Sequence, residues 1–218
     1  MRPPDRSSFR CKPLVRHTVT NLLPSILLAM GLVTGTSAQA DERGNSGVFN
    51  AEDVGQRNFG RTLNLEDPTG RMRSLSEFRG KVVLLYFGFI QCPDVCPTEL
   101  ARLAELRRRL GPAAGKVQVL FVTLDPERDT ADVLREYAPA FDPDFIGLRG
   151  NPAATASAVR EFRVVYQKIP GRTADRYTID HSTYVYAIDP ASRLRLRFNL
   201  DLSIERMLDD VNALLGGR

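Results

Sequence analysis

The 218-residue chain contains no tryptophan, only three cysteines and only two histidines, so few side chains can carry thiol or metal chemistry. It also lacks a charge excess in its main part. The formal net charge is +4, but residues 1–40 hold five basic residues against one acidic residue, and the rest of the chain carries 25 of each sign. Nucleic-acid-binding domains concentrate basic residues on the folded part. We therefore expect no nucleic-acid partner.

The first 40 residues predict an export signal. A basic region ends at Arg16, an apolar core covers residues 22–33, and residues 38–40 (Ala-Gln-Ala) suit a signal-peptide cleavage site. The core is short for a membrane-spanning helix, which needs roughly 20 apolar residues. We favour cleavage after Ala40, with retention as a membrane anchor as the alternative.

An exported chain would work in the periplasm, or anchored to the inner membrane and facing the periplasm, where its N-terminal segment could contact the membrane surface. In a eukaryote the same leader would indicate the mitochondrial inner membrane. Residues 41–58 are polar and aperiodic, which predicts a flexible linker before a domain over residues 59–218. Without the leader, the only thiols and the only imidazole are those of Cys92, Cys96 and His181.

A nearly unbroken apolar run over residues 82–90 predicts a central strand that is buried on both faces, as in a mainly parallel sheet. Cys92 and Cys96 follow it directly, and leucines at helical spacing come next. Pro97 suits the first position of that helix. Loops at the carboxyl ends of such strands are where α/β sheets place their chemistry, so we expect the functional site here.

The remaining pattern predicts a mixed α/β sheet with helices on both faces. A β-hairpin is expected within residues 59–75, with its turn at the Pro68 to Gly70 segment. Further strands are expected over residues 117–124, 145–148, 164–169, 176–179, 184–188 and 193–198, the last as an antiparallel edge strand. Further helices are expected over residues 131–137, 151–162 and 204–215.

Two cysteines four positions apart at a helix start form a pair that can clamp a metal ion or close a disulfide. The partial positive charge of a helix N-terminus should favour the thiolate of Cys96. Soft thiolates and an imidazole suit copper, whereas zinc usually takes a fourth ligand. On the residues alone, His181 could instead be a surface-loop histidine that is hydrogen-bonded to Asp180.

Three motifs together resemble the SCO/SenC family. They are the segment from Cys92 to Pro97 (CPDVCP), the segment from Asp125 to Asp129 (DPERD) and the segment Asp180-His181-Ser182. Members of that family are thioredoxin-like copper chaperones that help to build the binuclear copper site of cytochrome c oxidase. The resemblance covers residues 59–216.

The resemblance implies a thioredoxin-like fold and a site in which Cys92, Cys96 and His181 bind Cu(I) and Cu(II). Asp125, at the end of the neighbouring strand, is expected to support the site without touching the metal, and Asp180 likewise. A helix-capping turn is the alternative for Asp125 and Asp129. The implied partners are the copper-site subunit of cytochrome c oxidase, a thioredoxin-like reductant and a copper donor.

A metallochaperone is therefore expected rather than an enzyme. The main alternative is a thiol-disulfide oxidoreductase that reduces the cysteines of a copper-receiving partner. Such enzymes usually carry C-x-x-C and a proline before the facing strand, whereas this chain has C-x-x-x-C and places Asp180-His181-Ser182 there. A thiol peroxidase and a copper or redox sensor are further alternatives, and the peroxidase would need an adjacent resolving thiol.

Overall fold

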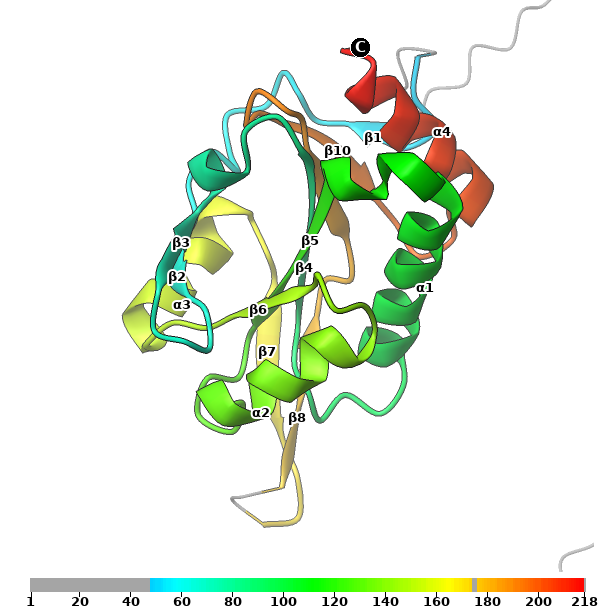
Figure 1. Cartoon of the computed structure of the whole chain (residues 1–218). Coiled ribbons are helices and arrows are strands. Elements are labelled where there is room, and N and C mark those ends of the chain that lie inside the picture. Colours follow the sequence, from blue (N-terminus) through cyan, green and yellow to red (C-terminus); the bar gives the residue numbers. More distant parts are fainter. Residues whose placement is uncertain (1–47, 174–175, 218) are drawn as a thin grey trace, which may run out of the picture. The chain divides into compact units, whose positions relative to one another are not determined.

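The central feature of the fold is a six-stranded mixed sheet with the strand order β1-β10-β9-β4-β5-β6 (Figure 1). The computed structural model describes residues 48–173 and 176–217. Strands β4, β5 and β6 run parallel, and β9, β10 and β1 add to this group by antiparallel pairing. The strands are β1 (Glu52–Asp53), β4 (Val82–Gly88), β5 (Val117–Thr123), β6 (Ile146–Leu148), β9 (Val185–Ile188) and β10 (Leu194–Phe198).

Strand β4 is the predicted central strand. Every one of its residues is buried, and it pairs in parallel with β5 and antiparallel with β9. Its unbroken apolar sequence fits this position, because a strand covered on both faces has no polar side to present to water. The prediction of a buried strand that ends just before the cysteines is confirmed.

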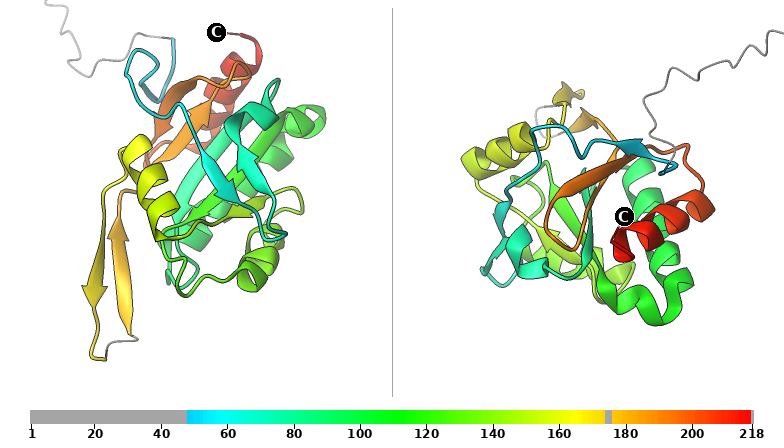
Figure 2. Two further views of the ribbon diagram at one scale, coloured as in Figure 1. Left: turned by 90° about the vertical axis from the view of Figure 1, so that its left-hand side faces the viewer. Right: turned by 90° about the horizontal axis from the view of Figure 1, so that it is seen from above.

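Helices cover both faces of the sheet, as predicted. Helices α1 (Val95–Leu110) and α4 (Ile204–Leu215) lie side by side on one face, and α3 (Pro152–Glu161) lies on the other (Figure 2). Helix α2 (Ala131–Tyr137) packs beside β6. Within residues 48–173 and 176–217, no helix is both long and apolar enough to cross a membrane. Short 3₁₀ segments cover Leu75–Phe78, Gly111–Lys116 and Ala138–Ala140.

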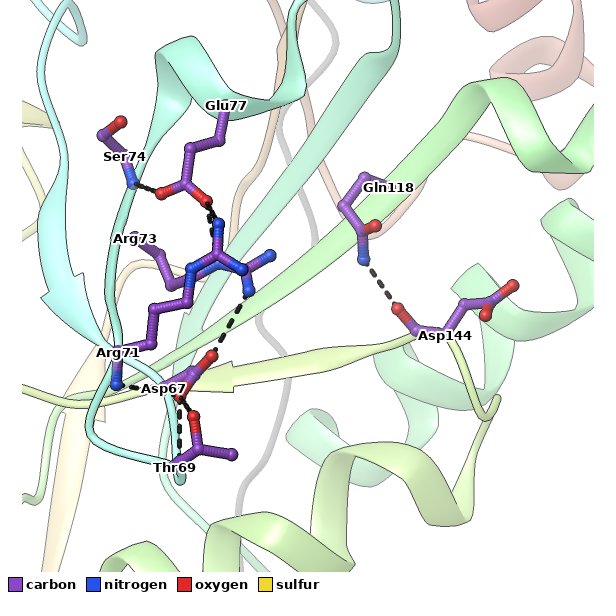
Figure 3. A network of polar contacts seen from close by, with 8 residues as sticks. All are labelled: Asp67, Thr69, Arg71, Arg73, Ser74, Glu77, Gln118 and Asp144. Carbon is purple, nitrogen blue, oxygen red and sulfur yellow. Dashed lines mark hydrogen bonds and ion pairs between the residues drawn. The ribbon is translucent and has the colours of Figure 1, made fainter.

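The predicted N-terminal hairpin is confirmed as β2 (Asn64–Glu66) and β3 (Met72–Ser74). Figure 3 shows how the carboxylate of Asp67 organises its turn: it accepts hydrogen bonds from the Thr69 amide at 2.8 Å and hydroxyl at 2.6 Å, and it pairs with Arg73. Residues 67–70 form the turn, as their Asp-Pro-Thr-Gly sequence predicts.

The linker predicted over residues 41–58 is wrong for the part that the structure describes. Phe49, Ala51 and Val54 are buried, and strand β1 pairs with β10. The carboxylate of Asp210 in α4 accepts hydrogen bonds from the amides at positions 50 and 51, both at 2.8 Å. Strand β10 therefore lies inside the sheet rather than at its edge. Residues 1–47, which include the predicted leader, lie outside the described residues.

Strands β7 (Tyr166–Pro170) and β8 (Tyr177–His181) pair with each other in a separate antiparallel ribbon. Figure 2 shows that this ribbon projects from the body of the molecule. His181 is the last residue of β8 and pairs with Tyr166, the first residue of β7. The ribbon therefore carries His181 at the end that joins the body.

Candidate metal centre

The loop after β4 delivers Cys92 and Cys96 to the start of α1. The helix begins at Val95, so Cys96 is its second residue and Pro97 its third, not its first as the sequence predicted. Pro97 still lies in the first turn, where a missing N–H costs no intrahelical hydrogen bond. The Cys96 amide donates a hydrogen bond to the sulfur of Cys92 over 3.4 Å. The two cysteines are therefore adjacent, and both are free.

His181 reaches Cys96 although 85 positions separate them in the sequence. Its Nε2 lies 3.6 Å from the Sγ of Cys96, and its Nδ1 lies 3.0 Å from the carbonyl oxygen of Ser182. Because a carbonyl only accepts, Nδ1 carries the proton and Nε2 presents its lone pair to the sulfur. Metal-binding histidines are commonly oriented in this way. The hydrogen bond of His181 thus goes to Ser182 and not to Asp180.

The ring of His181 packs against two aromatic side chains. The ring centroids of Phe89 and Tyr86 lie 6.0 Å and 6.4 Å from it, both in edge-on arrangements.

Cys96 is fully buried and Cys92 is half-buried. Across the described part of the chain, no three His, Cys, Asp or Glu side chains stand together in a ready-made metal site. The Cys96 sulfur therefore contacts His181, while the Cys92 sulfur contacts the backbone amide of Cys96.

Burial dominates the electrostatics of this cluster. It raises the pKa of the Cys96 thiol to about 12, although the hydrogen bonds from Phe89 and Tyr86 act in the opposite direction. The expected stabilisation of the Cys96 thiolate by the helix start is therefore outweighed by its removal from water. Burial also lowers the pKa of His181, against the Ser182 hydrogen bond and the charge of Asp180. The imidazole is thus neutral at pH 7, as a metal ligand must be.

This difference in burial predicts selective thiol chemistry. With the reduced chain at pH 8, iodoacetamide is expected to modify Cys92 at least about tenfold faster than Cys96, since only the accessible thiolate reacts. Modification of Cys96 should accelerate as the pH rises, because its thiolate fraction grows until the pH reaches its pKa of about 12. Peptide mass spectrometry over a time course measures both rates. Equal rates at pH 8 would contradict the burial of Cys96.

Asp125, the first predicted supporting residue, faces the ribbon and not the cysteines. Its fully buried carboxylate accepts a hydrogen bond from the Tyr177 hydroxyl at 2.6 Å and another from Arg128. The Arg128 guanidinium stacks over the Tyr177 ring at 3.6 Å and donates to the Tyr177 carbonyl oxygen at 2.9 Å. Asp125 therefore ties the turn after β5 to the first residue of β8.

Strand alternation connects this contact to His181. Residues at positions i, i+2 and i+4 of a strand share a face, so Tyr177, Ile179 and His181 lie on one side of β8. Ile179 is buried and extends the core along that side. Asp180, the second predicted supporting residue, is exposed on the opposite side and has no hydrogen bond to His181 in the described structure. Its influence on His181 is through charge alone.

Asp129 has a different role from Asp125. Its buried carboxylate accepts hydrogen bonds from the Thr123 hydroxyl at 2.5 Å and from the Ile90 amide at 3.1 Å. The second contact fixes the chain two residues before Cys92. The alternative of a helix-capping turn does not describe either aspartate, because the side chain that caps α2 is that of Thr130.

Gly88 and Tyr86 of β4 also form the site, although in the sequence they stand out only as part of an apolar run. A Cβ added at Gly88 would lie 2.8 Å from the Sγ of Cys96 and 3.0 Å from the Phe121 ring, so only glycine leaves room for this sulfur. A glycine inside a strand often marks such a close approach, and this signal was present in the sequence. The hydroxyl of Tyr86 lies 3.7 Å from the same sulfur.

The comparison with protein families decides the relationship. Residues 51–216 match the family model described as SCO1/SenC. The chain belongs to the SCO1/SenC family. A mitochondrial SCO2 homolog of Bos taurus is 39% identical over 160 residues, which cover 72% of this chain and 59% of the bovine protein. A SCO2-like protein of Rickettsia felis is 34% identical over 187 residues, which cover 85% of this chain and 91% of that protein.

Solved structures of SCO1/SenC proteins share the fold. The structure of Bradyrhizobium japonicum ScoI with copper bound is 36% identical, with a TM-score of 0.66 over 72% of this chain and 99% of that chain. The predicted thioredoxin-like fold, a mixed sheet flanked by helices with an N-terminal hairpin, is confirmed. The predicted membership of the SCO/SenC family is confirmed as well.

Proposed function

We propose that this SCO1/SenC protein is a copper metallochaperone that binds Cu(I) and Cu(II) through Cys92, Cys96 and His181. The observation that carries the proposal is the 3.6 Å approach of the Cys96 sulfur to a histidine nitrogen whose lone pair points at it. Thiolate sulfur and imidazole nitrogen are ligands that copper prefers. The copper bound to the Bradyrhizobium relative supports this choice of metal.

The protonation states of the ligands make copper binding depend on pH. Copper must displace the proton of Cys96, whose pKa is raised by burial, whereas His181 is already neutral. Copper affinity is therefore expected to increase with pH. Two thiolates give the site a net charge of −1 with Cu(I) and zero with Cu(II), so neither oxidation state leaves a large uncompensated charge in the buried site. The site can hold copper in both states.

The proposed recipient is the copper-site subunit of cytochrome c oxidase, because the Sco family is a family of cytochrome c oxidase assembly proteins. A copper donor must load the site. A thioredoxin-like reductant must keep the two thiols reduced, because an exported pair of cysteines tends to oxidise. We place the protein outside the cytoplasm, with residues 1–40 as its signal peptide or membrane anchor.

One observation favours the second candidate, a thiol-disulfide reductase. Cys92 is half-buried rather than fully buried, and its sulfur accepts a hydrogen bond from an amide in the first turn of α1. Such an arrangement suits an attacking thiolate. Cys96 would then be the buried resolving thiol. The substrate in this case would be a disulfide of the copper recipient, which would be reduced to two thiols while Cys92 and Cys96 are oxidised to a disulfide.

A copper titration of the reduced full chain tests the proposed function. We expect saturation at one copper per chain and, with Cu(II), an absorption band from sulfur-to-copper charge transfer. An insulin-reduction assay on the same sample tests the reductase alternative. Absence of saturable copper binding, or binding without that band, would contradict the chaperone proposal. Rapid insulin reduction without copper binding would favour the reductase.

Asp125→Asn is expected to lower copper affinity about tenfold, within the range known for residues that support metal ligands. The amide loses the charge that pairs with Arg128 and so loosens the strand that carries His181. Asp132→Asn is the matched control, because Asp132 is exposed and, within residues 48–173 and 176–217, its ion pair is with Arg135 of the same helix. Competition with a copper chelator measures both affinities, and circular dichroism checks the fold. Equal affinities in the two variants would contradict a supporting role for Asp125.

A further inference from the structure

Tyr86 contacts both a proposed sulfur ligand and the proposed nitrogen ligand. It lies on β4 and is fully buried. Its hydroxyl donates a hydrogen bond to the Sγ of Cys96 over 3.7 Å, and its ring packs edge-on against His181. Neither the family motifs nor the apolar pattern of β4 assigns this residue to the site.

The Tyr86 hydroxyl needs a hydrogen-bond partner because it is buried. Burying a hydroxyl without a hydrogen bond costs free energy, and Cys96 is the partner that satisfies it. A protonated thiol is a weak acceptor, whereas a thiolate bound to copper carries negative charge and accepts a stronger hydrogen bond. The contact between Tyr86 and Cys96 should therefore strengthen when copper replaces the thiol proton.

We propose that Tyr86 is a positioning residue that orients the Cys96 sulfur toward His181 and, by donating a hydrogen bond to the copper-bound thiolate, favours Cu(I) over Cu(II). This inference rests on the proposed copper site. Hydrogen bonding around a ligating sulfur is a general means of tuning the potential of a metal site. The thiolate holds more negative charge when the ion is Cu(I), so the hydrogen bond stabilises the reduced state more.

The chain offers a matched control for this hydroxyl. Tyr186 lies on the neighbouring strand β9 and is also buried, but its hydroxyl has no hydrogen-bond partner in the described part of the chain. Its ring packs against Phe87 and Phe162 instead of the cysteine cluster. Tyr186→Phe therefore removes a buried hydroxyl of the same kind without touching the proposed ligands.

The experiment compares the full-length wild type with Tyr86→Phe and Tyr186→Phe after copper loading. All three are expected to bind one copper. In Tyr86→Phe the sulfur-to-copper charge-transfer band should move to longer wavelength, because the thiolate becomes a better electron donor. The ratio of Cu(I) to Cu(II) at a fixed potential should fall by about tenfold, as expected for the loss of one hydrogen bond to a charged group. Tyr186→Phe should match the wild type.

Two results would overturn the inference while leaving the copper site in place. One is a Tyr86→Phe spectrum and potential equal to those of the wild type, and the other is an equal shift in Tyr186→Phe. A wild type without a thiolate-to-copper band would overturn the proposed function itself, and the role of Tyr86 with it. If the wild type binds copper and shows the band, failure of the Tyr86 role can be distinguished from failure of the proposed function.

Discussion

Cys96→Ala is expected to lower the affinity of the chain for Cu(I) by about 100-fold or more, which exceeds the 10- to 100-fold cost of losing a residue that only supports a ligand. Cys96 is the centre of the cluster: its amide meets the Cys92 sulfur, and its own sulfur meets His181. Removing that sulfur leaves the thiolate of Cys92 and the imidazole of His181. Among the described residues, these two side chains make no hydrogen bond with each other.

Cys11→Ala is the matched control for this variant, because Cys11 lies in the predicted leader, outside the described residues. Affinities are measured by competition with a Cu(I) chelator under reducing conditions. The removal of one buried sulfur leaves only a small cavity beside Gly88, so the variant should remain folded by circular dichroism. Wild-type Cu(I) affinity in folded Cys96→Ala would exclude this sulfur as a ligand.

His181→Ala is expected to lower Cu(II) affinity by about 100-fold, the upper end of the cost of losing a supporting residue, and to change the charge-transfer spectrum. Cu(I) affinity should fall less, since two thiolates alone can hold this soft ion. The imidazole is already neutral, because burial lowers the pKa of His181. Its contribution should therefore be present at pH 7 and above, and be lost only as the pH falls through its own pKa.

The control for His181→Ala is His17→Ala, which removes the other histidine of the chain. His17 lies in the predicted leader, so this variant should keep the copper affinity and spectrum of the wild type. Isothermal titration and absorption spectroscopy measure the two quantities. If His181→Ala retained the Cu(II) affinity and spectrum of the wild type, copper would be bound without the imidazole.

The sequence predicted the centre of the fold well because that part is governed by burial. An apolar run as continuous as residues 82–90 has few alternatives to a central strand, and the motifs that follow it identified the family. The approach of His181 to Cys96 was predicted through the family resemblance alone. No local pattern indicates a contact between residues that are 85 positions apart.

The edges of the fold were predicted less well, because their stability comes from tertiary contacts. Strand β1 has two residues and no apolar periodicity, and it is held by β10 and by the carboxylate of Asp210. The pKa of Cys96 was expected to be low on the basis of its helix position. Its burial raises that pKa to about 12. The glycine at position 88 gave a sign of close packing in the sequence, but the contact with Tyr86 could not be read from local sequence.

The two predicted supporting aspartates, Asp125 and Asp180, show how far the alternation of side chains along a strand can predict their positions. In the sequence of β8, YTIDH, the apolar Ile179 shares a face with His181, and Asp180 must then point the other way. This pattern was available before the structure. The link from Asp125 through Tyr177 to the same face was not available, because it depends on how the ribbon lies against the turn after β5.

X-ray absorption spectroscopy of the Cu(I)-loaded full chain tests the central claim most directly, because it counts the atoms bound to the metal. Two sulfur ligands and one imidazole nitrogen per copper are expected, with the nitrogen signal lost in His181→Ala and one sulfur lost in Cys96→Ala. A copper ion surrounded only by nitrogen and oxygen, or a wild-type signal that neither substitution alters, would contradict it.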